Sequence, residues 1–178
     1  FEQSLYLDDL FTFLAIVPRI RPAAGARPVP VPIRQGFRFE NVGFKYPGAE
    51  QWAVRGLDFA LAPGERIALV GENGAGKTTL VKLLARLYDP REGRILLDGV
   101  DLREYDLFSL RRNVGVIFQD FVRYDFLLRE NIAVGNIARL EDEPRIESAA
   151  ARSLADTVAA RLPARYGQML GRRFEGGV

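Results

Sequence analysis

The sequence predicts an α/β fold, and three consecutive features support this prediction. The run Arg66 to Val70 is short, apolar and partly β-branched, as is typical of a parallel strand buried on both faces. A glycine-rich turn follows it directly, and residues 77–87 then have the composition of a helix. A strand, a tight turn and a helix in this order form a common unit of α/β proteins.

The composition is that of a folded protein without cysteine or histidine chemistry. Of its 178 residues, 48% are hydrophobic and 27% are charged. The 25 basic and 23 acidic residues leave a formal charge of only +2, so the composition gives little support for nucleic-acid binding. The lack of Cys excludes disulfides, zinc sites and thiol chemistry, and the lack of His means that any acid–base chemistry uses other groups.

The N-terminal part is predicted to be a helix followed by a linker. Residues 1–17 form an amphipathic pattern, with Leu7, Leu10, Phe11 and Leu14 on one side and Glu2, Asp8 and Asp9 on the other. Half of the ten prolines lie between Pro18 and Pro32, which predicts an extended linker over residues 18–36 and a domain that begins at residue 37. Because the first residue is Phe1 rather than Met, we expect the chain to be a piece of a longer protein.

Further strands and helices are predicted on both sides of the glycine-rich turn. Aromatic residues around 37–46 and the run Val54 to Leu61 indicate strands, separated by a Pro47-Gly48 turn. Arg94 to Leu97 is predicted to be a strand that Asp98-Gly99 closes with a hairpin-type turn. The remaining predictions are a helix over 107–112, a strand over 114–118, and a mostly helical region from Leu127 onward.

The segment from Gly71 to Thr79, GENGAGKTT, fits the phosphate-loop pattern G-x-x-x-x-G-K-[ST]. Glycines can adopt positive φ and lack a Cβ, so several backbone N–H groups can converge on a phosphate, next to the positive N-terminal end of the following helix. Lys77 is expected to reach the β and γ phosphates, and the Thr78 hydroxyl to bind Mg²⁺. A chance match in a glycine-rich turn is the alternative. The predicted nucleotide contacts in this segment are Gly71, Glu72, Asn73, Gly74, Ala75, Gly76, Lys77, Thr78 and Thr79.

Several other segments stand at characteristic distances from this loop. Tyr46, in FKYPG, lies 25 residues before Gly71, and Gln119, in VIFQD, lies 42 residues after Lys77. The stretches YDPREGRILLDGVDL, RENIAVG and FEGG begin at residues 88, 129 and 174. With these motifs, residues 37–178 resemble the first part of the ATP-binding domain of an ABC transporter. The whole chain resembles the region after the last transmembrane helix of a bacterial ABC exporter.

The resemblance implies a P-loop NTPase fold, with a RecA-like core, an antiparallel β subdomain and a helical subdomain, of which this chain carries an incomplete share. It implies ATP and Mg²⁺ as cofactors, with Tyr46 stacking on adenine. It also implies catalytic roles for Lys77 and Gln119, the glutamine contacting Mg²⁺ and the attacking water. The alternative for Tyr46 is an aromatic residue on an edge strand.

The resemblance further implies two partners and a location. One partner is a second ATP-binding domain, and the other is the transmembrane domain of the same chain, contacted through residues 119–127. This region is apolar for a loop, since it contains Phe121, Tyr124, Phe126 and Leu127, although these side chains could instead pack the helical subdomain. The expected location is the cytoplasmic face of the inner membrane, and no nucleic-acid partner is expected.

In the family, the Walker B Asp, the Glu after it, a His and the LSGGQ motif complete the catalytic site, and all of these would lie beyond Val178. We therefore expect residues 1–178 alone to bind ATP weakly, to turn none over, and to be aggregation-prone, because the 66–70 strand would lack a neighbour. Two other functions remain open: a non-transport ABC ATPase acting on DNA or ribosomes, and a P-loop kinase. The first predicts a basic, aromatic-interleaved face, and the second leaves Tyr46 and Gln119 without a role.

Overall fold

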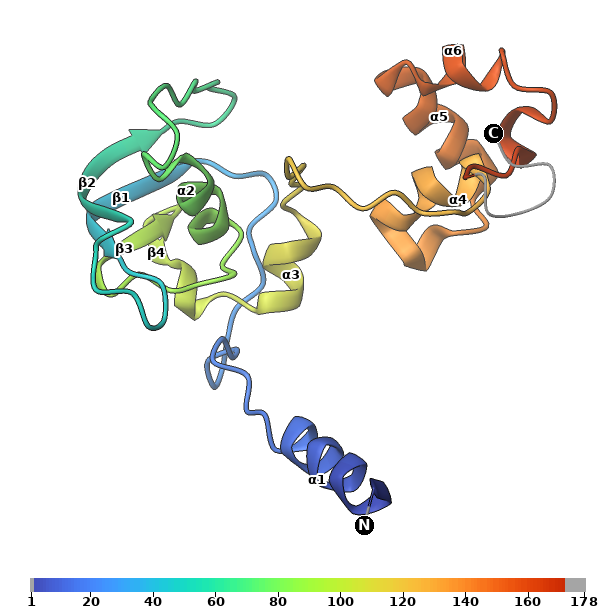
Figure 1. Ribbon diagram of the computed structural model, residues 1–178. Coiled ribbons are helices and arrows are strands. Elements are labelled where there is room, and N and C mark those ends of the chain that lie inside the picture. Colours follow the sequence, from blue (N-terminus) through green and yellow to red (C-terminus); the bar gives the residue numbers. More distant parts are fainter. Residues whose placement is uncertain (1, 172–178) are drawn as a thin grey trace. The chain divides into compact units, whose positions relative to one another are not determined.

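The computed structural model describes residues 2–171, with side chains described from residue 7 onward (Figure 1). The FEGG segment at 174–177 lies outside the described residues. The chain divides between Ile117 and Phe118 into two compact units. The first unit contains the sheet and the predicted phosphate loop, and the second unit is helical, so each is described by itself.

The sheet of the first unit has four antiparallel strands. These are β1 (Phe37–Phe44), β2 (Val54–Leu61), β3 (Glu92–Leu97) and β4 (Val100–Asp101), in the order β2-β1-β3-β4. Phe37 pairs with Leu61 on one side and with Leu97 on the other. The predicted strands around 37–46, 54–61 and 94–97 are therefore confirmed, and together they form an antiparallel sheet.

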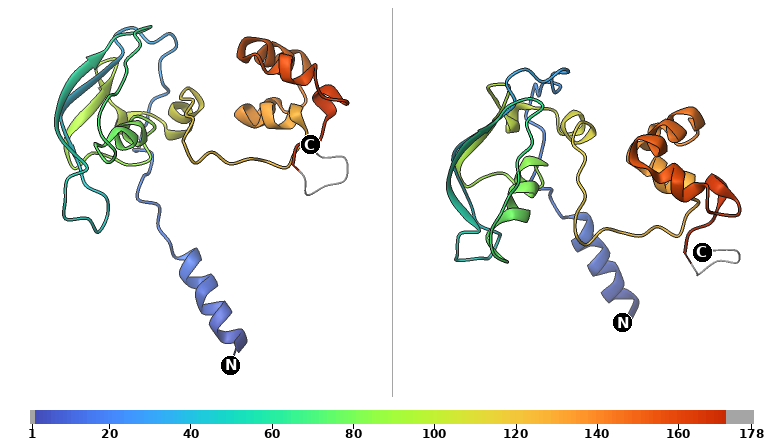
Figure 2. Two further views of the ribbon diagram at one scale, coloured as in Figure 1. Left: turned by 45° about the horizontal axis from the view of Figure 1, so that its top comes forward. Right: turned by 90° about the horizontal axis from the view of Figure 1, so that it is seen from above.

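Helix α2 (Lys77–Leu84) covers one face of this sheet (Figure 2). Its residues Leu80 and Leu83 belong to one buried cluster with Phe39, Val42 and Ile95 of the strands. Burial of such side chains contributes about 1.5–3 kcal/mol each. The hydrophobic core thus fixes α2, and with it the loop that precedes α2, against the sheet.

The Asp98-Gly99 turn joins β3 to β4 as predicted. Both residues have positive φ, 49° and 79°, which is the conformation that a type I′ hairpin turn requires. The Asp98 carboxylate also accepts hydrogen bonds from the backbone N–H groups of Arg34, Gln35 and Gly36, at 2.7 to 3.1 Å. This single side chain therefore attaches the residues before β1 to the β3–β4 turn.

Two short helices follow the sheet in the first unit. The 3-10 helix η1 (Leu102–Glu104) begins after Asp101, and α3 (Leu107–Arg112) begins after Asp106. The Asp106 carboxylate accepts a hydrogen bond of 2.6 Å from the Ser109 N–H, as an N-cap residue does. The predicted helix over 107–112 is confirmed.

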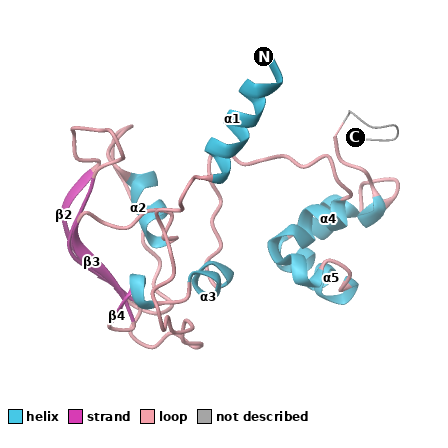
Figure 3. Ribbon diagram, turned by 90° about the horizontal axis from the view of Figure 1, so that it is seen from below, coloured by secondary structure: helices cyan, strands magenta, loops and turns pink. Residues whose placement is uncertain are grey.

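The second unit is built from short helices (Figure 3). They are α4 (Leu128–Ala133), η2 (Val134–Arg139), α5 (Glu143–Ser153), α6 (Ala155–Ala159) and η3 (Arg165–Gly167). Asp142 caps α5 by accepting a hydrogen bond from the Arg145 N–H, and a proline stands in the first turn of this helix. Leu128, Ile146, Ala150 and Ala159 are buried. The prediction of a mostly helical region from Leu127 is confirmed.

Helix α1 (Glu2–Leu14) precedes the irregular segment 15–36. The side chains described in α1 are exposed, including Leu10 and Phe11 of the predicted apolar face. In the part of the chain that the structure describes, no helix is both long enough and apolar enough to cross a membrane.

Two predicted strands are wrong. Residues 66–70 and 114–118 form no strand, and the Val70 and Ile117 side chains are 94% and 93% exposed. A β-segment is stabilised by ladder hydrogen bonds to a neighbouring strand. Within residues 2–171 neither segment pairs with another strand, so their β-forming composition alone does not hold them in a sheet.

Candidate nucleotide-binding site

The glycine-rich loop bends sharply into α2 because two of its glycines have positive φ. These are Gly74 and Gly76, at 87° and 88°. A Cβ on Gly76 would lie 2.5 Å from Val54 Cγ1 and 2.6 Å from the Ala53 carbonyl oxygen, whereas one on Gly74 would meet open space. Glycine is therefore required at position 76 for two reasons. The backbone has a positive φ, and Val54 of β2 and the preceding Ala53 leave no space for a side chain.

Lys77 lies across the loop that it follows. Its Nζ donates hydrogen bonds of 2.7 Å to the carbonyl oxygens of both Gly71 and Glu72. No ion pair of Lys77 occurs among the described residues, so two neutral carbonyl groups hold this ammonium. A phosphate oxygen is a stronger partner for an ammonium than a carbonyl is, because the hydrogen bond becomes charge-assisted on both sides.

The first turn of α2 also offers hydrogen-bond donors, its backbone N–H groups, to an anion. The N-cap residue is Gly76, which makes no side-chain cap, and no acidic residue occurs in the first turn. The first N–H groups of a helix have no partner within the helix, and its N-terminal end carries a partial positive charge. The loop, the lysine and the helix end thus combine the features that bind polyphosphates in proteins.

Tyr46 lies beside this helix. Its hydroxyl is 3.1 Å from the Thr79 hydroxyl, and its ring makes edge contacts with Phe44 and Tyr88, with centroids 5.0 and 5.4 Å apart. The Lys82 ammonium lies 5.4 Å from the centre of the Tyr46 ring. The aromatic residue predicted for the base and the loop predicted for the phosphates are therefore neighbours within the first unit.

The two threonines of the motif differ in their surroundings. Thr79 is buried and its hydroxyl is paired with Tyr46, whereas Thr78 is exposed at the start of the helix. Thr78 is thus the hydroxyl that suits a bound cation. Among the described residues no group of three or more His, Cys, Asp or Glu could hold a metal ion. A Mg²⁺ ion that enters with the oxygens of a triphosphate fits these residues, because it needs few protein ligands.

The remaining predicted residues are exposed. Glu72, Asn73 and Ala75 are exposed residues of the loop. Gln119 belongs to the second unit, in the irregular segment before α4. Lys82 was not predicted from the sequence, although a signal existed: the chain has only three lysines among 25 basic residues, and two of them are Lys77 and Lys82.

Several known proteins are similar to this chain. A family model described as "ABC transporter" matches residues 54–171. The subtilin transport ATP-binding protein SpaT of Bacillus subtilis is 32% identical over 177 residues, which is 99% of this chain and 28% of that protein. An ATP-dependent lipid A-core flippase of Methylobacillus flagellatus is 43% identical over 120 residues, 67% of this chain and 21% of the flippase.

A beta-(1→2)glucan export ATP-binding/permease protein, NdvA of Rhodopseudomonas palustris, is 38% identical over 154 residues, 86% of this chain and 25% of that protein. Among solved structures, a bacterial Atm1-family ABC exporter with ATP bound matches with a TM-score of 0.83 and 35% identity, over 97% of this chain and 30% of the exporter chain. The chain thus spans between about a fifth and a third of the length of these relatives.

Proposed function

Since the chain belongs to the ABC transporter family, we propose that it is the ATP-binding part of an exporter. In this proposal the exporter couples ATP binding and hydrolysis to solute transport across a membrane. The observation that carries the proposal is the position of Lys77. Its ammonium bridges the two carbonyl groups of a loop that leads into an uncapped helix, a cradle that suits a triphosphate.

In this proposal ATP binding exchanges the partners of Lys77. The ammonium leaves the carbonyl oxygens of Gly71 and Glu72 and pairs with β and γ phosphate oxygens, while the backbone N–H groups of residues 71–79 surround the phosphates. The Thr78 hydroxyl would hold Mg²⁺, and this ion would supply positive charge to the phosphates. Tyr46 stacks on adenine, held close to the helix by its contact with Thr79.

Gln119 acts after binding. We assign it the role of orienting the attacking water and completing the Mg²⁺ ligands, because a carboxamide can donate to and accept from a water molecule at the same time. Lys77 stabilises the charge that develops on the transferred phosphoryl group. Both side chains are therefore catalytic residues of the proposed ATPase.

The segment that follows Gln119 is the proposed contact with the transmembrane domain of the same protein. Phe121, Val122, Tyr124 and Phe126 are between 42% and 67% exposed, and the rings of the last two are stacked 5.3 Å apart. Exposed apolar groups in one short segment favour a protein partner over solvent. The second proposed partner is another ATP-binding domain, and the proposed location is the cytoplasmic face of the inner membrane.

A role on DNA or ribosomes has no support among the relatives described above, whose names refer to transport, flipping or export.

The experiment that tests the proposal measures equilibrium binding of MgATP to the full-length protein. The Lys77→Ala variant is expected to bind at least 10-fold more weakly, because it removes a charge-assisted contact. Lys45→Ala is the matched control, since the Lys45 ammonium lies 4.7 Å from the centre of the Trp52 ring, outside the segment 71–79. Equal affinity of the Lys77 variant and the natural protein would overturn the proposal.

A further inference from the structure

Arg86 is a buried cation at the end of the phosphate-binding helix. It follows Ala85, the C-cap residue of α2, and has a positive φ of 46°. Only 4% of its side chain is exposed. A buried guanidinium is costly unless its N–H groups are hydrogen-bonded, so the partners of Arg86 decide what it does.

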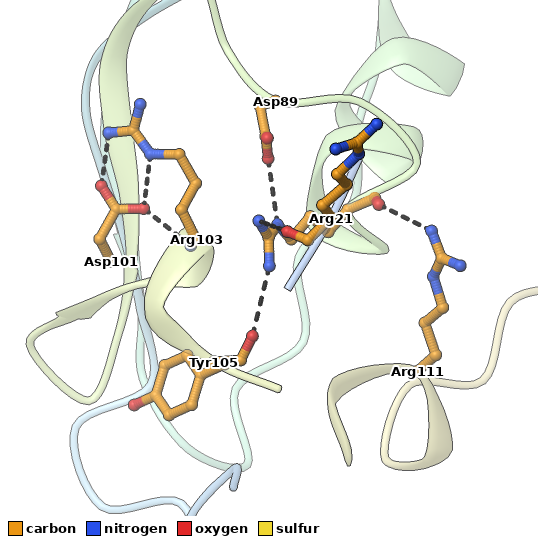
Figure 4. Close-up of polar contacts among 7 residues, drawn as sticks. Arg21, Asp89, Asp101, Arg103, Tyr105 and Arg111 are labelled. Atoms are coloured by element: carbon orange, nitrogen blue, oxygen red, sulfur yellow. Dashed lines mark hydrogen bonds and ion pairs between the residues drawn. The ribbon is translucent and has the colours of Figure 1, made fainter. Parts of the chain in front are cut away.

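Three segments of the chain supply those partners (Figure 4). The guanidinium donates to the Asp89 carboxylate at 3.1 Å, to the Tyr105 carbonyl oxygen at 3.3 Å and to the Arg21 carbonyl oxygen at 3.1 Å. The carbonyl oxygen of Arg86 itself accepts a hydrogen bond of 3.1 Å from Arg111 of α3. Arg86 therefore joins the helix to its following loop, to the residues around η1 and α3, and to the segment before the sheet.

The contact with Arg21 reaches furthest along the chain, since the two residues lie 65 positions apart. A cavity of about 550 Å³ is lined by Arg19 and Ile20 together with residues of β1 and of the segment after α2, among them Phe44, Tyr88 and Asp89. Residues 19 and 20 thus border open space, and the hydrogen bond from Arg86 attaches the neighbouring Arg21 to the end of α2. Another attachment of the same segment is at Arg27, whose backbone pairs with Glu104 and Asp106 and makes no contact with α2.

Helix α2 connects Arg86 and the segments that it joins to the nucleotide site. Its eight residues span about 12 Å, with Lys77 at one end and Arg86 just beyond the other. Because Arg86 lies just beyond α2, a displacement of this helix on phosphate binding would also displace Arg86 and the residues that it holds. We propose that Arg86 is a positioning residue that holds residues 19–21 to the end of the phosphate-binding helix, so that this segment follows the nucleotide state. The proposal rests on ATP being the ligand of the loop.

The test uses the full-length protein with spin labels at Ala23→Cys and Arg38→Cys. Position 23 lies two residues from Arg21, position 38 lies on β1, and residues 1–178 contain no native cysteine. The distance distribution between the labels is measured with and without MgATP, together with the ATP dissociation constant. With Arg86 intact, we expect a narrow distribution that shifts on ATP binding.

In Arg86→Gln we expect a broad distribution that ATP no longer shifts, and an ATP dissociation constant within about twofold of the natural one. Arg86→Lys keeps the charge but not the fork of donors, so it should remain paired with Asp89 and still release Arg21. This variant supplies the answer if the Gln variant does not fold. Arg27→Ala is the matched control, because it breaks only the exposed ion pair with Glu104.

A narrow, ATP-responsive distribution in the Arg86 variants would overturn the inference, as would a distribution in the natural protein that ATP leaves unchanged. Both results leave the proposed function intact if MgATP still binds in a Lys77-dependent manner. Failure of the natural protein to bind ATP would instead remove the proposed function, and the inference with it.

Discussion

The hydroxyl groups of Tyr46 and Thr79 lie 3.1 Å apart, although the two residues are 33 positions apart in the sequence. Tyr46 follows β1, and Thr79 lies in the first turn of α2. The hydrogen bond involves the hydroxyl group at the edge of the Tyr46 ring and not the face of the ring. It therefore positions an aromatic side chain at the edge of the phosphate loop without using the surface that would stack on a base.

Replacement of Tyr46 separates these two contributions. Tyr46→Ala removes the ring, and we expect MgATP to bind about 5- to 150-fold more weakly, since a base–aromatic contact contributes about 1–3 kcal/mol. Tyr46→Phe keeps the ring and loses only the hydroxyl, so its affinity should stay within about threefold of the natural protein. Titration calorimetry measures both. An equal loss in the two variants would show that the bond to Thr79, and not stacking, is what matters.

Gly74 and Gly76 provide a matched pair for the loop. Both have φ close to 88°, so alanine at either site incurs the cost of a left-handed conformation, about 1–2 kcal/mol. Only at Gly76 would the new Cβ also overlap Val54 and the Ala53 carbonyl oxygen. We expect Gly76→Ala to lower the free energy of unfolding by about 2–5 kcal/mol and to abolish ATP binding.

Gly74→Ala should remain folded and bind ATP with a moderate loss, because its Cβ meets open space. Denaturant titration and ATP binding are measured on the same preparations. If the two variants lose stability equally, the overlap at Val54 and Ala53 is not what makes Gly76 necessary.

Local signals in the sequence were sufficient for the strands β1, β2 and β3 and for the loop that leads into α2, whereas the antiparallel arrangement was expected only from the family resemblance. Alternating aromatic residues predict β1, and Asp98-Gly99 predicts the hairpin turn, because both depend on neighbouring residues only. The motif from Gly71 to Thr79 likewise predicts the loop and the start of α2 at Lys77. The role of Gln119 remains a prediction, since that residue belongs to the other unit.

Features that depend on distant partners could not be predicted in this way. The segment 66–70 has a β-forming composition, but a strand also needs a neighbour to pair with, and composition does not supply one. Arg86 follows a helix as many exposed arginines do. Its partners Arg21 and Tyr105 lie 65 and 19 residues away in the sequence. No local sequence pattern therefore predicts that Arg86 is buried.

Asp98 should contribute to the acid sensitivity of the fold. Partial desolvation acts to raise the pKa of this carboxyl, but the N–H groups of Arg34, Gln35 and Gly36 and the charge of Arg34 outweigh it, and the pKa lies below its ordinary value. A group whose pKa is lower in the folded state stabilises the protein above its unfolded pKa, and this contribution is lost as the pH falls through the folded value. The window therefore lies below about pH 4.

Asp98→Asn should reduce stability at pH 7 and flatten the loss of stability below about pH 4, because asparagine tolerates the positive φ but carries no charge. Thermal unfolding from pH 7 to pH 3 measures this, with Glu50→Gln, at an exposed position before β2, as the control. The same acid dependence in the Asp98 variant and the natural protein would assign the effect to other carboxylates.

Phe121 offers a test of the proposed contact with the transmembrane domain. Its ring is 60% exposed and lies 5.6 Å from the Arg123 guanidinium, so Phe121→Ser removes little packing within residues 118–171. We expect the unfolding midpoint and the ATP dissociation constant to stay close to the natural values, while transport per ATP hydrolysed falls at least threefold.

Phe108→Ser is the matched control, since Phe108 is 74% exposed on α3 and belongs to no proposed contact. A clear drop in the unfolding midpoint of the Phe121 variant would favour the alternative, that this ring packs the helical unit, and an equal loss of transport in both variants would remove the contact from the proposal.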